Sequence, residues 1–80
     1  MKKLYDVCVP RINVNDETVI IMLILIAEGQ KVKKEQELCV ISTSKQVHTI
    51  TAPFKANIKK INMGVGEIKN IGDTIIILEK

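Results

Sequence analysis

The residues best suited to chemistry in this sequence lie in one short polar segment, residues 42–46, between two apolar stretches. At its centre, Lys45 offers a primary amine on a compact, mobile side chain. Ser44 and Gln46 flank it with uncharged polar groups. A lysine in a polar turn is by default a solvated surface charge. Its position relative to the surrounding elements must therefore decide whether it has a further role.

No other set of side chains predicts a catalytic or metal site. His48 is the only histidine, and we expect it on a short strand beside the polar segment, without a nucleophile to activate. Cys8 and Cys39 lack zinc-site spacing and are too few for a disulfide scaffold, so we expect two buried thiols in a reducing cytoplasm. The glycines of 64–72 lack the strand, turn and helix context of a phosphate loop and indicate β-turns. We expect no enzymatic activity from this chain alone.

Composition limits the size of the protein and the class of its partners. Eighty residues, 46% of them hydrophobic, predict a single domain over residues 1–80. Only 2% are aromatic, so the core must be aliphatic and no rings are available for stacking on bases. The net charge of +3 comes from lysines interspersed with glutamates, which argues against a nucleic-acid partner. The longest apolar run, 19–27, has about half the length of a membrane span and predicts a core element.

Short stretches rich in Ile and Val, separated at close intervals by turn formers, predict an all-β fold. The segment around Gly29 is a polar turn with Val32 as its one apolar anchor. Two of the expected strands form a hairpin with Lys45 at its tip. The six expected strands span 4–9, 19–27, 38–42, 47–51, 56–63 and 74–79.

The sequence also contains an internal repeat with an offset of 37 residues. Without a gap, Gly29 aligns with Gly66, and several apolar positions align as well: Leu38 with Ile75, Val40 with Ile77, Ile41 with Leu78, Ile21 with Ile58, Ile24 with Ile61, and Ile26 with Met63. Two such units would pack face to face as a flattened barrel or sandwich of two small antiparallel sheets related by a quasi-two-fold axis. That axis places the Lys45 hairpin at one end and the termini toward the other.

The repeat assigns opposite faces to the residues of the first unit's long apolar strand. Ile21, Ile24 and Ile26 should face the core, as should their equivalents Ile58, Ile61 and Met63. The outward positions carry aliphatic side chains in the first unit and polar ones in the second. We interpret the first set as a docking or self-association face away from the Lys45 tip; these residues are Ile20, Met22, Leu23 and Leu25. The alternative is that the loop at 11–17 or the N-terminal strand folds over them.

The whole chain resembles the biotinyl/lipoyl attachment domain family, in particular the lipoyl domains of 2-oxo acid dehydrogenase acyltransferases. Lys45 takes the place of the modified lysine in that pattern. Gly29 lies sixteen residues before it, and Ala52 and Pro53 lie seven and eight residues after it. The segments that carry the resemblance are VCVPRI, EGQKVKKEQEL, STSKQVHTITAPFKA and INMGVGEIKNIGDTIIILE.

The resemblance implies a carrier with lipoate joined to Lys45 as a swinging arm, and the two cysteines indicate a cytoplasmic location. The implied partners are a lipoate ligase or transferase and the dehydrogenase and acyltransferase components of a multienzyme complex, with no membrane partner. A biotin domain would show Met-Lys-Met, so Ser44-Lys45-Gln46 favours lipoate over biotin. Ser42 and Ser44 replace the family's acids, and Ala56 replaces a glycine. The alternative is an unmodified module of this type used for protein interaction or for assembly of a larger enzyme.

Overall fold

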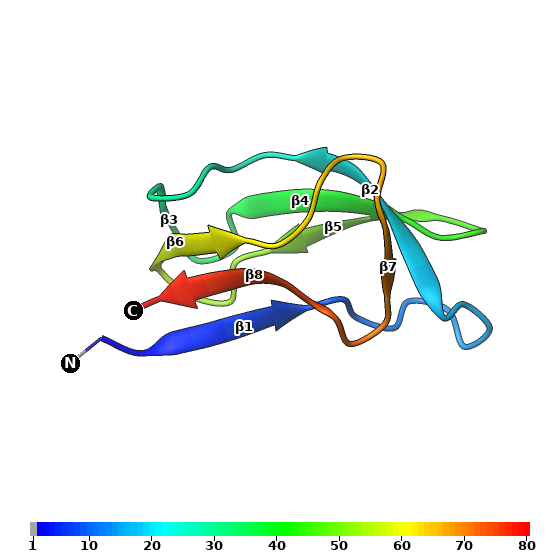
Figure 1. The fold of residues 1–80 in the computed structure, drawn as a ribbon, viewed down its shortest axis with the longest axis horizontal. Coiled ribbons are helices and arrows are strands. Elements are labelled where there is room, and N and C mark those ends of the chain that lie inside the picture. The colour runs from blue at the N-terminus through cyan, green and yellow to red at the C-terminus, as the bar shows by residue number, and fades with distance from the viewer. Residues whose placement is uncertain (1) are drawn as a thin grey trace.

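A computed structural model describes residues 2–80, which form two antiparallel sheets of four strands each and contain no α-helix (Figure 1). The first sheet has the strand order β1-β8-β6-β3, and the second has the order β5-β4-β2-β7. The predicted all-β fold is confirmed. The strands are β1 (Leu4–Cys8), β2 (Thr18–Ile24), β3 (Lys31–Val32), β4 (Glu37–Ser42), β5 (Val47–Thr51), β6 (Ala56–Ile61), β7 (Ile68–Asn70) and β8 (Thr74–Glu79).

The two halves of the chain are equivalent, but they exchange strands. In each sheet, two strands come from residues 4–42 and two from residues 47–79, so the expectation that each unit forms a layer of its own was wrong. The backbone N–H of Gly29 donates to the carbonyl of Ile58, and that of Gly66 donates to the carbonyl of Ile21, both at 2.7 Å. Gly66 is the equivalent of Gly29, and Ile21 is the equivalent of Ile58. The two halves therefore donate the same hydrogen bond to each other, which confirms the repeat.

The core lies between the sheets and is built from matching positions of the two halves. Leu38 and its equivalent Ile75 are both fully buried, and so are Ile41 and Leu78. Val32, the predicted anchor of the first polar turn, is 1% exposed. Complete burial of each such side chain contributes about 1.5–3 kcal/mol. The core therefore consists of aliphatic side chains on strands that face each other across the sandwich.

Two turns in each half contain a residue with a positive φ, and these residues occupy equivalent positions in the two halves. Gly29 and Gly66 have φ values of 88° and 89°. Glu35 has a φ of 69° at the position where the second half has Gly72, with a φ of 92°. Glycine adopts such angles without the steric penalty that other residues meet. The repeated turns fix the path of the chain between β2 and β4 and between β6 and β8.

The sequence pattern did not predict strands β3 and β7, because both segments were expected to be turns. Each has only two or three residues and pairs only with a strand of the other half. Cys8 was expected to be buried, but it is exposed, because it lies at the end of edge strand β1 with its side chain away from the core. Cys39 is fully buried as expected, and burial raises the pKa of its thiol to about 11.

The described part of the chain, residues 2–80, contains no helix that could cross a membrane.

Candidate functional site

The hairpin between β4 and β5 is closed by Thr43, which bonds across the turn with both its backbone and its side chain. The N–H of Thr43 donates to the carbonyl of Gln46 at 2.8 Å. Its Oγ1 accepts the N–H of Gln46 at 3.1 Å and that of Lys45 at 3.3 Å. These bonds satisfy the polar groups of the backbone where the ladder ends. The turn is therefore stabilised by the side chain of Thr43, which is itself a residue of the turn.

Lys45 lies at the tip of this hairpin, at the end of the molecule opposite both termini (Figure 1). Its side chain is exposed, as are those of Ser44 and Gln46. No hydrogen bond or salt bridge engages the Lys45 ammonium group within residues 2–80. The amine is thus free to react with a group that approaches from solvent.

A loop from a distant part of the sequence holds the hairpin from one side. The Asn13 amide donates to Thr43 Oγ1 at 3.0 Å and to the Asp16 carboxylate at 2.8 Å. The Ser44 hydroxyl donates to the same carboxylate at 2.9 Å. Arg11 braces the loop from within, since its guanidinium donates to the carbonyl of Asp16 at 3.2 Å. We call Asn13, Asp16, Thr43 and Ser44 the tip clamp.

The tip clamp places a negative charge beside the lysine. The pKa of Asp16 is lowered from its ordinary value, first by the hydrogen bond from the Asn13 amide and next by that from Ser44. The positive charge of Lys45 lowers it further. Asp16 is therefore ionised at neutral pH, next to the residue that precedes the lysine. Serine occupies position 44 in place of an acid, and the sequence pattern did not predict that this carboxylate lies beside it.

This loop is also where the two halves differ in length. Strand β5 begins 43 residues after β1, whereas β8 begins 37 residues after β4, so the first half has six extra residues between the starts of β1 and β4. Pro10 corresponds to Pro53 immediately before the insertion. The change of offset from 43 to 37 is a signal in the sequence that could have identified the loop in advance.

The four aliphatic residues singled out on the first unit are exposed on the second sheet. Ile20 is 45% exposed, and the loop at 11–17 does not cover it, because the loop turns toward the hairpin. The proposed face was expected to lie away from the tip, and for Ile20 this was wrong. Ile20 pairs with Ser42 and, with Ser44 and Asp16, lines a hollow of about 230 Å³ next to the turn. The other three are Met22, Leu23 and Leu25.

The remaining candidates form no second site. His48 is exposed on β5 beside the hairpin, as expected. Among residues 2–80, no group of three histidine, cysteine or acidic residues is arranged to hold a metal ion. The larger hollow, about 340 Å³, lies at the opposite end against Lys31, Asn57 and Lys80, far from the tip. The tip clamp is thus a hydrogen-bonded polar group that lies next to Lys45.

The chain matches a known family model over most of its length. A family model described as "Biotin-requiring enzyme", which covers biotin and lipoyl attachment domains, matches residues 6–78. The matched range includes the hairpin, the tip clamp and all eight strands in whole or in part. No curated protein matches the chain.

Proposed function

The chain belongs to the biotin/lipoyl attachment family, and we propose from this premise that it is a carrier domain whose cofactor is joined to Lys45. The observation that supports the proposal most directly is the position of this lysine. It is exposed, free of ion pairs within the described residues, and placed at the tip of a closed hairpin at one end of the molecule. A carrier of this kind supplies position, and the attached group supplies the chemistry.

The residues of this chain fit attachment by an amide. The neutral Lys45 amine would attack the activated carboxyl carbon of the cofactor, the activating group would leave, and the amine would lose a proton to solvent. When lipoate is bound, its disulfide ring supplies the means to accept acyl groups and electrons. The tether then raises the effective concentration of that group at a docked active site.

The tip clamp supports the proposal because it holds the turn in one geometry. A modifying enzyme must bring a single amine to a reactive carbon, and preorganisation lowers the entropic cost of that encounter. Asp16 and Asn13 reach the hairpin from a separate loop, so the orientation of the turn does not depend on the turn residues alone.

We assign lipoate in preference to biotin because the residues flanking Lys45 are Ser44 and Gln46, without the methionines typical of biotin attachment. The partners follow from this assignment. They are a lipoate ligase or transferase and the components of a 2-oxo acid dehydrogenase type of complex. Two free cysteines fit a reducing compartment, and we place the protein in the cytoplasm on that basis.

The test is enzymatic attachment followed by intact mass measurement. A lipoate ligase acting on the folded domain should add one lipoyl group, and Lys45→Arg should abolish the gain because arginine has no amine that can form the amide. Lys34→Arg is the matched control, since Lys34 is also exposed in a turn but lies away from the tip. Loss of the mass gain in Lys34→Arg, or modification of Lys45→Arg, would show that Lys45 is not the attachment site.

A biotin ligase and Ser44→Asp extend the test to the cofactor. A gain of biotin without lipoate would keep the carrier function and overturn the assignment of lipoate. Modification of Ser44→Asp but not of the natural sequence would show that the acid at position 44 is required and that Asp16 does not replace it.

The alternative function, an unmodified module for protein interaction, is favoured by the exposed aliphatic residues of the second sheet. No mass gain with either ligase, for the natural sequence and for Ser44→Asp, would support the module and overturn the carrier.

A further inference from the structure

The repeat builds a hollow of the same construction at each end of the molecule. We call the one beside the Lys45 turn, of about 230 Å³, the tip hollow. It shares five positions with the hollow of about 340 Å³ near the termini under the offset of 37 residues. The shared positions and their equivalents are Thr18 and Lys55, Val19 and Ala56, Ile20 and Asn57, Ser42 and Glu79, and Thr43 and Lys80. The fold thus forms the hollow twice, and the side chains determine what each can hold.

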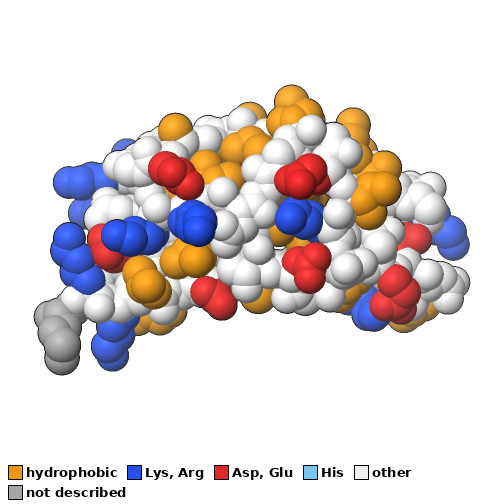
Figure 2. Space-filling view, viewed as in Figure 1, with side chains coloured by type: hydrophobic (Ala, Val, Ile, Leu, Met, Phe, Trp, Pro, Cys, Tyr) orange, Lys and Arg blue, Asp and Glu red, His pale blue; other side chains and the backbone are white. Residues whose placement is uncertain are grey.

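The two hollows differ in charge. Three lysines line the hollow near the termini, namely Lys31, Lys55 and Lys80. Glu79, which also lines it, is paired with Lys2 at 3.6 Å and with Lys59 at 3.9 Å. Figure 2 shows lysines gathered at this end of the molecule. Of the described residues that line the tip hollow, only Asp16 is charged, so the tip hollow favours cations where its equivalent favours anions.

The Asp16 carboxylate can accept a further hydrogen bond. It accepts one from the Asn13 amide at 2.8 Å and one from the Ser44 hydroxyl at 2.9 Å. A carboxylate offers about four lone-pair sites, so about two remain for a group that enters the hollow. The neighbouring acid in the sequence, Glu17, is already paired with Arg11 at 3.1 Å. Asp16 is therefore the charge that an entering cation meets.

The other walls of the tip hollow fit a charged group carried on an apolar stem. Ile20 is 45% exposed and supplies an aliphatic surface. Ser42 supplies a hydroxyl that donates to the carbonyl of Thr43 at 3.2 Å and keeps lone pairs to accept with. An arginine side chain has this construction, because its methylene stem packs on apolar surface while its planar guanidinium binds a carboxylate through two parallel N–H···O bonds. A lysine ammonium is a compact point charge without this fork.

We propose that the tip hollow binds an arginine side chain of an enzyme that acts on the group carried by Lys45. An enzyme that receives Lys45 in its active site must cover this hollow, because Ser44 lines the hollow and directly precedes the lysine. The volume is sufficient for a side chain, since a water molecule occupies about 30 Å³ in the liquid and the hollow measures about 230 Å³.

Cofactor attachment strengthens this contact, and this part of the inference rests on the proposed function. An amide at Lys45 removes the positive charge of the amine. That charge acts on Asp16, because it lowers the pKa of the carboxyl in addition to the hydrogen bonds from Asn13 and Ser44. Once Lys45 is neutral, the negative charge of Asp16 is no longer balanced by its neighbour. The tip hollow therefore distinguishes the loaded carrier from the unmodified chain.

The experiment is an NMR titration with N-acetylarginine amide as the probe, at concentrations up to about 100 mM because an exposed ion pair is weak. N-acetylcitrulline amide, which has nearly the same shape and no charge, is the control, with sodium chloride added to equal ionic strength. The arginine probe should shift the amide signals of Ile20, Ser42 and Ser44 and leave those of Asn57 and Glu79 in place. Equal shifts with citrulline would overturn the proposal, as would shifts at the hollow near the termini.

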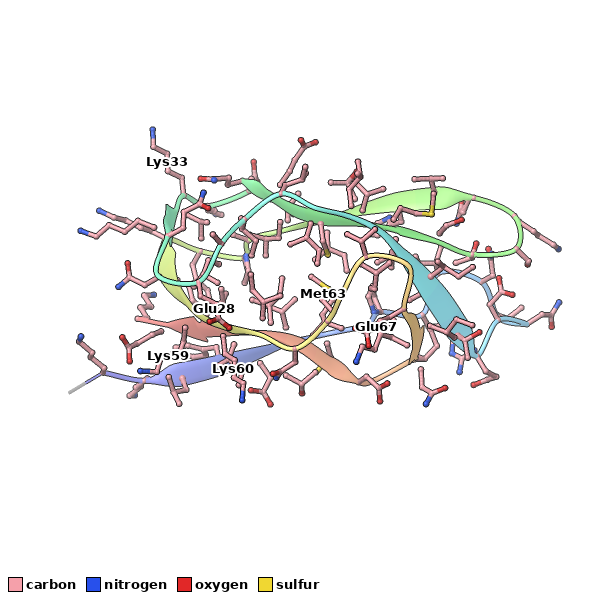
Figure 3. All side chains as sticks on the ribbon, turned by 45° about the horizontal axis from the view of Figure 1, so that its top comes forward. Glu28, Lys33, Lys59, Lys60, Met63 and Glu67 are labelled. Atoms are coloured by element: carbon pink, nitrogen blue, oxygen red, sulfur yellow. The ribbon has the colours of Figure 1, made fainter. Side chains whose placement is uncertain are left out.

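The repeat supplies a variant that keeps the tip clamp intact. Thr18→Lys installs the residue found at the equivalent position 55, and it should abolish binding of the arginine probe by placing a like charge in the hollow. Asp16→Asn should weaken binding about two- to fivefold. Glu28→Gln is the matched control and should leave binding unchanged, since Glu28 is an exposed carboxylate that lies near Lys59 and Lys60 (Figure 3). Unaltered binding in both Thr18→Lys and Asp16→Asn would exclude the tip hollow.

Variants of Lys45 test the effect of attachment separately from attachment itself. Lys45→Gln removes the charge as an amide does and should strengthen binding of the arginine probe about twofold at low salt, whereas Lys45→Arg should not. The lipoylated domain should behave as Lys45→Gln does. If the chain gains no lipoyl group, the proposed function fails, and Lys45→Gln still tests the hollow. Shifts of Ile20 and Ser42 on attachment alone, with loss of probe binding, would show that the attached group fills the hollow and would overturn the proposal.

Discussion

The halves of this chain, residues 4–42 and 47–79, have the same backbone and different surfaces. Their buried positions match closely, as in the pair Ile21 and Ile58, which are 0% and 1% exposed. Their exposed positions do not match, since Leu23 corresponds to Lys60, and the loop at 11–17 has no counterpart in the second half. The comparison teaches that burial determines the shape, while function is carried by residues and insertions that the shape leaves free to vary.

The largest effects are expected from equivalent core residues. Ile41→Ala and Leu78→Ala should each lower the free energy of unfolding by about 2–5 kcal/mol, because both side chains are fully buried. Urea denaturation would measure the two losses, which should agree within about 1 kcal/mol if the halves are equally packed. If these variants do not fold, Ile21→Val and Ile58→Val should each cost about 0.5–1.5 kcal/mol. A large difference between the two stability losses within either pair would show that the two halves are not equally packed.

Gly72→Ala and Glu35→Gly, at equivalent positions in the second turn of each half, should change the free energy of unfolding in opposite directions. Gly72→Ala should lower the free energy of unfolding by about 1–2 kcal/mol, because alanine must adopt the φ of 92°. Glu35→Gly should raise it by up to about 1 kcal/mol, because it relieves the strain of a φ of 69°. Thermal denaturation of the two variants tests this. Destabilisation by Glu35→Gly would show that the glutamate side chain stabilises its turn more than the backbone strain costs.

The tip clamp is present in one half only, and its hydrogen bonds should lower the pKa measured for Asp16. Its lowered pKa means that the associated stabilisation is present above the ordinary carboxyl pKa and is lost as the pH falls through the lowered value. Carboxyl carbon shifts should show Asp16 titrating below the ordinary aspartate pKa, and both Asn13→Ala and Ser44→Ala should raise the midpoint. The larger rise is expected for Asn13→Ala, whose amide is the main cause of the shift. An unchanged midpoint in both variants would show that the clamp does not form in solution.

The smallest effect is expected at the tip itself. Lys45→Ala should change the free energy of unfolding by less than about 0.5 kcal/mol, because the side chain is exposed and has no partner within the described residues. Denaturation with urea measures this directly. A loss above about 1 kcal/mol would mean that Lys45 stabilises the turn and would weaken its assignment as a free attachment point.

The sequence was sufficient to predict what depends on repetition and local pattern. Short stretches rich in Ile and Val between turn formers predicted the longer strands, and the alignment of Gly29 with Gly66, together with several apolar positions, predicted the repeat. The short strand β7 could not be predicted, because its three residues become a strand only when β2 of the other half lies beside them. The hydrogen bond from Ser44 to Asp16 joins residues 28 positions apart, and nothing in either local segment indicates that they meet.

The exchange of short strands between halves also determines the order in which the molecule can fold. Within residues 2–80, β4 with β5 is the only pairing between strands that follow each other directly in the chain. Every other ladder must close a longer loop before it gains contacts, and such topologies fold in milliseconds to seconds. We therefore expect the β4–β5 hairpin to form early in the folding transition state. The segment that presents Lys45 would then serve as the nucleus on which the rest of the chain assembles.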